Sequence, residues 1–142
     1  MNRVAFYILA QSGSHARLGY ACRLAEKAYK LQHKVHIHAA DAATVVELDN
    51  LLWTFRDGSF VPHDRLDTGS LTGAPVTLGY DDQLPEEKDL LINLAGEIPD
   101  FASGFVRIAE LVAGDDTSKT KGRQRYASYK NRGCELDYHE IA

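Results

Sequence analysis

The side chains best suited to bind another molecule lie in one polar stretch near the end of the sequence. Residues 117–133 carry six basic side chains and no acidic one, whereas residues 81–100 carry seven acidic side chains and one lysine. On a helix, spacings of four and three put Lys119, Arg123 and Tyr126 on one face. Cations beside an aromatic ring can bind a carboxylate and pack an apolar group, and they can also bind nucleic acid phosphates. A solvated basic helix without a ligand is the third interpretation.

A second group of side chains, around the single tryptophan, is suited to a protein interface. Trp53 lies two residues from both Leu51 and Phe55, so on a helix it faces away from each, and Phe60 follows a predicted turn. Since one amphipathic helix buries only one face, we expect some of these rings to be exposed. Exposed aromatic patches are typical of protein interfaces. The alternative is that all of these rings pack into one local core.

The sequence lacks the patterns that enzymes with alternating strands and helices use. The turn at residues 10–15 has one glycine where the dinucleotide fingerprint has three, and no phosphate-binding loop ends in Gly-Lys-Ser or Gly-Lys-Thr. No Gly-x-Ser-x-Gly elbow occurs, and neither Cys22 nor Cys134 has an evident base. The carboxylates of residues 81–87 fall in a polar loop, whereas catalytic carboxylates need burial or a partner. We therefore expect no catalysis and no cofactor, with a nucleotide-binding enzyme as the rival hypothesis.

Two histidines are the candidates for a metal site. His36 and His38 alternate along a predicted strand and point to one face of it. A structural zinc site needs about four ligands, and the other histidines are scattered along the chain. We therefore expect no metal, and solvated or hydrogen-bonded strand histidines instead.

Length and composition indicate one globular domain over residues 1–142. The chain is 44% apolar and 25% charged, with a net charge of −4, which suits one hydrophobic core and argues against coating nucleic acid non-specifically. No run approaches the ~20 apolar residues of a membrane helix, and no signal sequence is evident. We expect a cytoplasmic protein with reduced thiols and no membrane contact.

Hydrophobic periodicity predicts strands that alternate with helices. Strands are predicted at residues 4–9, 35–38, 76–78 and 90–94. Residues 106–112 fit either a helix or a strand, and we favour the strand. Helices are predicted at residues 18–29, 41–55 and 117–132, the second capped by Asp41 and the last ended by Gly133. Residues 64–74 are expected to form a surface loop, and residues 134–141 a tail that can be extended. The pattern predicts an α/β fold: a single domain with an open, mainly parallel, Rossmann-like sheet flanked by helices, without a nucleotide-binding fingerprint.

Five blocks of sequence resemble the chi subunit family of bacterial DNA polymerase III. They are FYIL near the start, LLW-x6-FVPH at 51–63, GAPV at 73–76, DLLINL at 89–94 and RQRYASYKNRG at 123–133. The blocks follow the order of the family and cover nearly the whole chain. The resemblance implies a non-catalytic accessory subunit of the clamp-loader assembly, in which polymerase activity belongs to the whole holoenzyme.

The resemblance also implies a peptide-binding site on the basic helix. Family members bind the acidic C-terminal tail of single-stranded DNA-binding protein, which ends in Pro-Phe with a free carboxylate, so that DNA is contacted only indirectly. By position, Lys119, Arg123 and Tyr126 match the residues that bind this tail. Ala127 stands where some relatives carry another lysine, and Gly122 is expected to loosen the helix by up to ~1 kcal/mol relative to alanine. Direct binding of nucleic acid by this helix stays open as an alternative.

The second partner implied by the resemblance is the psi subunit of the clamp loader. The block with Trp53, Phe60, Val61 and Pro62 matches the part of the family associated with psi or another partner. Phe60 is assigned mainly to psi on this basis.

Overall fold

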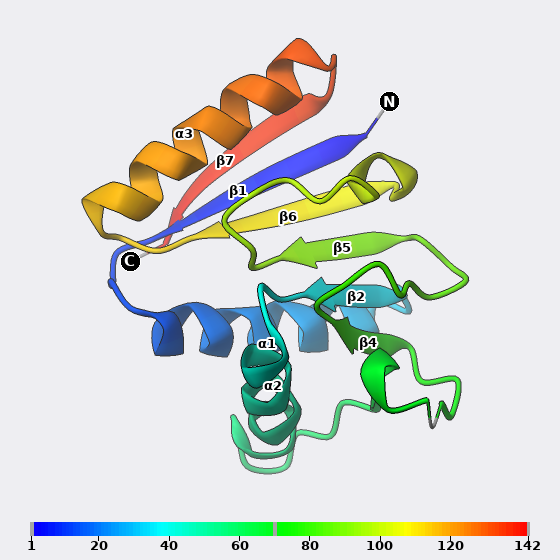
Figure 1. The fold of residues 1–142 in the computed structure, drawn as a ribbon. Coiled ribbons are helices and arrows are strands. Elements are labelled where there is room, and N and C mark those ends of the chain that lie inside the picture. The colour runs from blue at the N-terminus through cyan, green and yellow to red at the C-terminus, as the bar shows by residue number, and fades with distance from the viewer. Residues whose placement is uncertain (1, 70, 142) are drawn as a thin grey trace.

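The computed structural model describes residues 2–69 and 71–141, which form a twisted sheet with helices on both faces (Figure 1). The strands are β1 (Arg3–Leu9), β2 (Val35–His38), β3 (His63–Arg65), β4 (Val76–Gly79), β5 (Leu90–Asn93), β6 (Arg107–Val112) and β7 (Glu135–Ile141). The helices are α1 (Ser14–Lys30), α2 (Ala42–Thr54) and α3 (Asp116–Asn131), with short 3-10 turns η1 (Leu66–Thr68) and η2 (Ala102–Gly104). Helices α1 and α2 cover one face of the sheet, and α3 covers the other.

The sheet has the predicted class and two more strands than expected. Within the described residues, seven strands follow the order β3-β4-β2-β5-β6-β1-β7, and every neighbouring pair is parallel. The predicted "mainly parallel" sheet is therefore entirely parallel in this part of the chain. The tail at residues 134–141 is extended, as predicted, and pairs with β1 as β7. The strand at residues 63–65 was not predicted, because a three-residue polar segment has no apolar alternation; it forms by pairing with β4.

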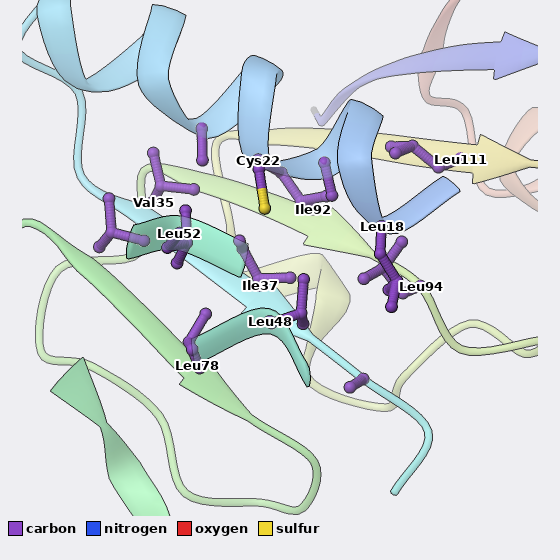
Figure 2. Close-up of a cluster of buried hydrophobic side chains, with 14 of the residues drawn as sticks. Leu18, Cys22, Val35, Ile37, Leu48, Leu52, Leu78, Ile92, Leu94 and Leu111 are labelled. Carbon is purple, nitrogen blue, oxygen red and sulfur yellow. The ribbon is translucent and has the colours of Figure 1, made fainter. Parts of the chain in front are cut away.

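The larger core lies between the sheet and the helices α1 and α2 (Figure 2). The apolar stripe of α2 meets that of α1 and the strands, and the predicted cap of α2 is present: Oδ1 of Asp41 accepts from the backbone N–H of Thr44 at 2.8 Å. Burial of such side chains stabilises the fold by about 25 cal/mol per Å² of apolar surface. The buried side chains include Leu18 and Cys22 of α1, Leu48 and Leu52 of α2, and Ile37, Leu78 and Ile92 of the strands. Because this stripe faces the core, the opposite side of α2 faces solvent.

Helix α3 is attached to the sheet by a buried polar cluster around Glu110. The carboxylate of Glu110, on β6, is 0% exposed. It accepts from Nε of Arg125 at 2.9 Å, from the hydroxyl of Tyr129 at 2.6 Å and from the amide of Asn93 at 2.9 Å. Burial raises the pKa of Glu110, while the charge of Arg125 and the hydrogen bonds oppose that shift. Arg125, one of the six basic residues of this stretch, is therefore not a surface cation, since its charge is matched inside the protein.

Gly122 has a packing role that the sequence interpretation missed. The residue is buried, and a Cβ at this position would lie 3.1 Å from both methyl groups of Val112 on β6. Glycine thus permits the helix to approach the sheet closely, where a larger residue would force a neighbour to move. Its low helix propensity is only one part of its effect.

We predict that Glu110→Gln lowers the free energy of unfolding by about 3–5 kcal/mol, because it leaves the guanidinium of Arg125 buried without its counter-charge. Urea denaturation measures the change. The control is Glu140→Gln, the same substitution on exposed β7, which should change stability by less than ~0.5 kcal/mol. Equal losses in the two variants would contradict the role of Glu110.

Candidate functional site

A groove lies between α3 and β7, over the strand β1. Its volume is about 550 Å³. The predicted residues Lys119, Arg123 and Tyr126 all line it, so the structure brings them together. The basic helix face also includes Lys130, which is exposed and lies outside the groove lining. The other lining residues are Gly122 of α3, Phe6, Ile8 and Leu9 of β1 with Ala10 after it, and Tyr138, Glu140 and Ile141 of β7.

The groove exists because β7 continues the sheet beside the helix. The rings of Phe6 and Tyr126 are 5.4 Å apart, which fixes α3 over β1. The parallel register pairs Phe6 with Tyr138 and Ile8 with Glu140. Alternate residues of the two strands therefore face the helix side together. The result is an apolar floor between two polar walls.

The two walls of the groove carry opposite charges. Lys119 and Arg123 supply cations from α3, whereas Glu140 supplies a carboxylate from β7 and accepts a hydrogen bond from the Tyr138 hydroxyl at 2.9 Å. This bond raises the pKa of Tyr138, and the charge of Arg123 opposes the shift. The sequence interpretation missed Tyr138 and Glu140 as site residues. Their alternation along an extended tail, placed beside the basic helix, was the signal that could have found them.

The aromatic surface, defined here as the side chains of Trp53 and Phe60, lies on the outer side of α2 and the turn that follows. Trp53 is 51% exposed and Phe60 is 62% exposed, and their ring centroids are 5.4 Å apart. The prediction that some of these rings are exposed is confirmed. Pro62 is half-buried, and Val61 is 0% exposed within the main core, so it supports this surface from below.

The turn that carries Phe60 is held at both ends. Glu26, a buried acid of α1, accepts hydrogen bonds from the side chains of Arg56 and Ser59. At the other end, the ring of His63 lies within hydrogen-bond distance of α2 and of the turn itself. A surface fixed in this way loses little conformational entropy when a partner binds.

The groove and the aromatic surface lie on different faces of the sheet. Figure 1 shows α3 on one face and α2 on the other, with the central strands between them. Partners that bind the two surfaces therefore need not overlap.

The candidate metal pair is buried in the protein. His36 contacts the Thr77 hydroxyl through Nδ1 at 2.8 Å, and its ring stacks on Phe105 with centroids 6.1 Å apart. His38 packs against Phe101 at 5.0 Å. Burial, together with the smaller effect of the neighbouring His38, lowers the pKa of His36 to about 3. Within residues 2–69 and 71–141, no group of three or more His, Cys, Asp or Glu side chains is arranged to hold a metal ion.

None of the helices in the described residues combines the length and the apolar composition that crossing a bilayer requires.

We predict that His36 makes the protein less stable as the pH falls. The unfolded histidine binds a proton below about pH 6.5, whereas the lowered pKa keeps the folded histidine neutral down to about pH 3. Stability is therefore lost through this window, by up to about 1.4 kcal/mol per pH unit for one histidine. The measurement is urea unfolding at about pH 7 and pH 5. In His36→Gln the loss between the two pH values should be smaller, and an equal loss would refute this assignment.

Comparison with known proteins identifies relatives over nearly the full length. The model of the family described as DNA polymerase III chi subunit, HolC, matches residues 1–137. The protein named DNA polymerase III subunit chi from Pseudomonas aeruginosa is 40% identical over 141 residues, covering 99% of this chain and 98% of the relative. The proteins of the same name from Haemophilus influenzae and Escherichia coli K12 are 32% and 30% identical, over 96% of this chain in each case and over 95% and 97% of those proteins.

Proposed function

The chain belongs to the chi family of DNA polymerase III subunits, and on that premise we propose that it is a non-catalytic accessory subunit that links the clamp loader to single-stranded DNA-binding protein. The family match supports a role in DNA replication as part of the polymerase III assembly. In this proposal the protein works in the cytoplasm, needs no cofactor, and contacts DNA only through its partners. Polymerase activity belongs to the assembly as a whole.

The groove is the proposed site for the acidic tail of single-stranded DNA-binding protein. The observation that carries the proposal is that Lys119, Arg123 and Tyr126 line one groove with an apolar floor. The two cations can form charge-assisted hydrogen bonds with the terminal carboxylate, while the phenyl ring of the last residue packs on Tyr126 and Ile8. A volume of about 550 Å³ suits a few peptide residues.

The aromatic surface is the proposed site for the psi subunit. Tryptophan and phenylalanine rings are enriched at the centre of protein interfaces. Here Phe60, on the turn held by Glu26 and His63, contacts the ring of Trp53 on α2. Its position on the face of the sheet opposite to α3 would let psi and the tail bind at once.

Direct binding of nucleic acid by α3 is the second candidate, and two observations weigh against it. Arg125 is buried and paired with Glu110, which removes one cation from the helix surface. Glu140 adds a carboxylate to the wall facing Lys119 and Arg123. Both reduce the positive field that phosphate binding needs.

We predict that Arg123→Ala weakens binding of an acidic peptide ending in Pro-Phe by about 1.5–3 kcal/mol, because a hydrogen bond to a charged group is lost. Isothermal titration with the folded protein measures the affinity. Lys130→Ala is the matched control, since it removes a cation of the same helix outside the groove. An unchanged affinity in Arg123→Ala, or an equal loss in both variants, would remove Arg123 from the site.

Two further titrations test the same site. Glu140→Gln removes the negative charge from the opposite wall, so the same peptide should bind slightly more tightly, by up to about 1 kcal/mol. A peptide with an amidated C-terminus should bind the wild type more weakly than the free acid does. For this amidated peptide, Arg123→Ala should lower the affinity by less than it does for the free acid. Binding of naked single-stranded DNA without affinity for the peptide would favour the nucleic acid candidate instead.

We predict that Phe60→Ala weakens the complex with psi by at least ~2 kcal/mol, the loss typical of a central interface residue. The measurement is the dissociation constant of the purified pair. Val46→Ala is the control, because Val46 is another exposed apolar residue of α2. A complex that survives Phe60→Ala unchanged would leave the aromatic surface without this role.

A further inference from the structure

A second groove lies on the face of the sheet opposite to α3, between α1 and the strands β1 and β7 (Figure 1). Its volume is about 310 Å³. Ala5 and Tyr7 line it, whereas Phe6 and Ile8 line the groove under α3, because side chains alternate between the two faces of a strand. Ala5 of β1 and its register partner Ala109 of β6 form the floor. These two small side chains leave space that larger residues would fill.

The walls of the second groove are apolar and open to solvent. Leu24 of α1 and Leu31, the residue directly after α1, form the wall on the helix side. Leu31 is 63% exposed, although it lies beside an apolar hollow that it does not fill. Large apolar side chains exposed around a hollow are typical of surfaces that bind a partner. The shape of the groove therefore suits one apolar side chain of another molecule.

Arginine and lysine side chains gather at one end of the second groove. Arg3 and Arg107 are register partners at the start of β1 and β6, so they project side by side from one face. Lys27, in the last turn of α1, lines the same end. Of these three, only Arg3 has an ion-pair partner in the described part of the chain, the exposed Glu135 at 3.4 Å. Because like charges on neighbouring strands repel each other, a bound anion would stabilise this arrangement.

We propose that the second groove binds an acidic segment of a partner protein and takes up one apolar side chain of that segment. The apolar side chain fills the space above Ala5 and Ala109. Carboxylates next to it in the segment bind Arg107 and Lys27. Asp137 of β7, the register partner of Ala5, lines the groove and can accept a hydrogen bond from a backbone N–H of the segment. This site is separate from both surfaces of the proposed function and does not depend on them.

A nucleic acid strand fits the second groove less well than an acidic peptide does. Its phosphates follow one another at every nucleotide and would meet the Asp137 carboxylate as well as the cations. Single strands also need free ring faces on which bases stack. The ring of Tyr7 is stacked on His139 with centroids 5.1 Å apart, and Tyr20 packs against the same ring at 5.6 Å. A peptide, by contrast, can place its carboxylates at the cationic end alone.

The first experiment titrates the free protein with the peptide acetyl-Glu-Asp-Leu-Glu-Asp-amide, which lacks the free terminal carboxylate proposed for the groove under α3. Nitrogen-15 NMR should show shifts at the amides that line the second groove. Replacing the leucine of the peptide by alanine should weaken binding about tenfold, because less apolar surface is buried. Added salt should also weaken binding, since the cations are exposed. An absence of shifts at the second groove overturns the proposal.

Two further observations separate other occupants of the second groove. Shifts there with oligothymidine but not with the peptide would assign the groove to nucleic acid. Shifts there that depend on protein concentration, without any peptide, would assign it to a second copy of the chain. Either result overturns the proposal.

The second experiment repeats the peptide titration with variants of the protein. Lys27→Ala should weaken binding about two- to fivefold, as for the loss of an exposed ion pair. Lys30→Ala is the matched control, since Lys30 belongs to the same helical turn, pairs with Glu26 at 3.9 Å and lies outside the groove lining. Ala5→Leu fills the floor and should weaken binding at least about tenfold.

Thermal unfolding shows whether Ala5→Leu is folded, and if it is not, the two lysine variants decide. Equal affinities in Lys27→Ala and Lys30→Ala overturn the proposal. So does wild-type affinity in a folded Ala5→Leu protein.

Discussion

The buried carboxylate of Glu110 is the interaction on which the position of α3, and with it the groove, depends. Helix α3 is strongly polar, and its buried residues are Gly122, Arg125 and Tyr129. Two of these three donate hydrogen bonds to Glu110, and the third permits the close approach to β6. An apolar stripe would hold the helix with little directional preference. The hydrogen bonds instead fix its rotation, because Arg125 and Tyr129 must face the sheet. That rotation directs Lys119 and Arg123 toward β7.

Much of this architecture could be predicted from the sequence, because buried parallel strands are apolar runs and the helices have clear stripes. The role of Arg125 could not be derived from helix periodicity alone, since a count of charges does not distinguish a buried cation from an exposed one. A signal existed in its partner: Glu110 interrupts the apolar strand of residues 107–112, and a buried acid needs donors. Pairing that acid with a particular cation requires the fold.

The two proposed surfaces differ in how far the sequence could define them. Helical spacing led us to expect that some rings around Trp53 are exposed, because one helix buries only one face, but it left open that all of them pack into a local core. Val61 lies beyond the helix, where no period applies, and its burial depends on how the turn packs. Only one wall of the groove could be predicted. The spacing along α3 indicated Lys119, Arg123 and Tyr126, whereas the wall formed by β7 depends on which strand the tail pairs with. Pairing between strands distant in sequence is a tertiary property, which local patterns do not encode.

The opposite charges on the two walls of the groove affect which anionic ligands it can bind. The protein carries a net charge of −4, so attraction of an acidic ligand must come from the local field of α3. Salt screens exposed charges beyond about 8 Å, which makes the nearest groups decisive. A nucleic acid strand brings a charge with every nucleotide and would place phosphates against both walls, where Glu140 repels them. A peptide with a terminal carboxylate can direct it to Lys119 and Arg123 and lay an apolar ring over Ile8. The Glu140 carboxylate on β7 therefore weakens binding of the peptide less than binding of a nucleic acid strand. This difference favours the proposed protein tail over bare DNA as the occupant of the groove.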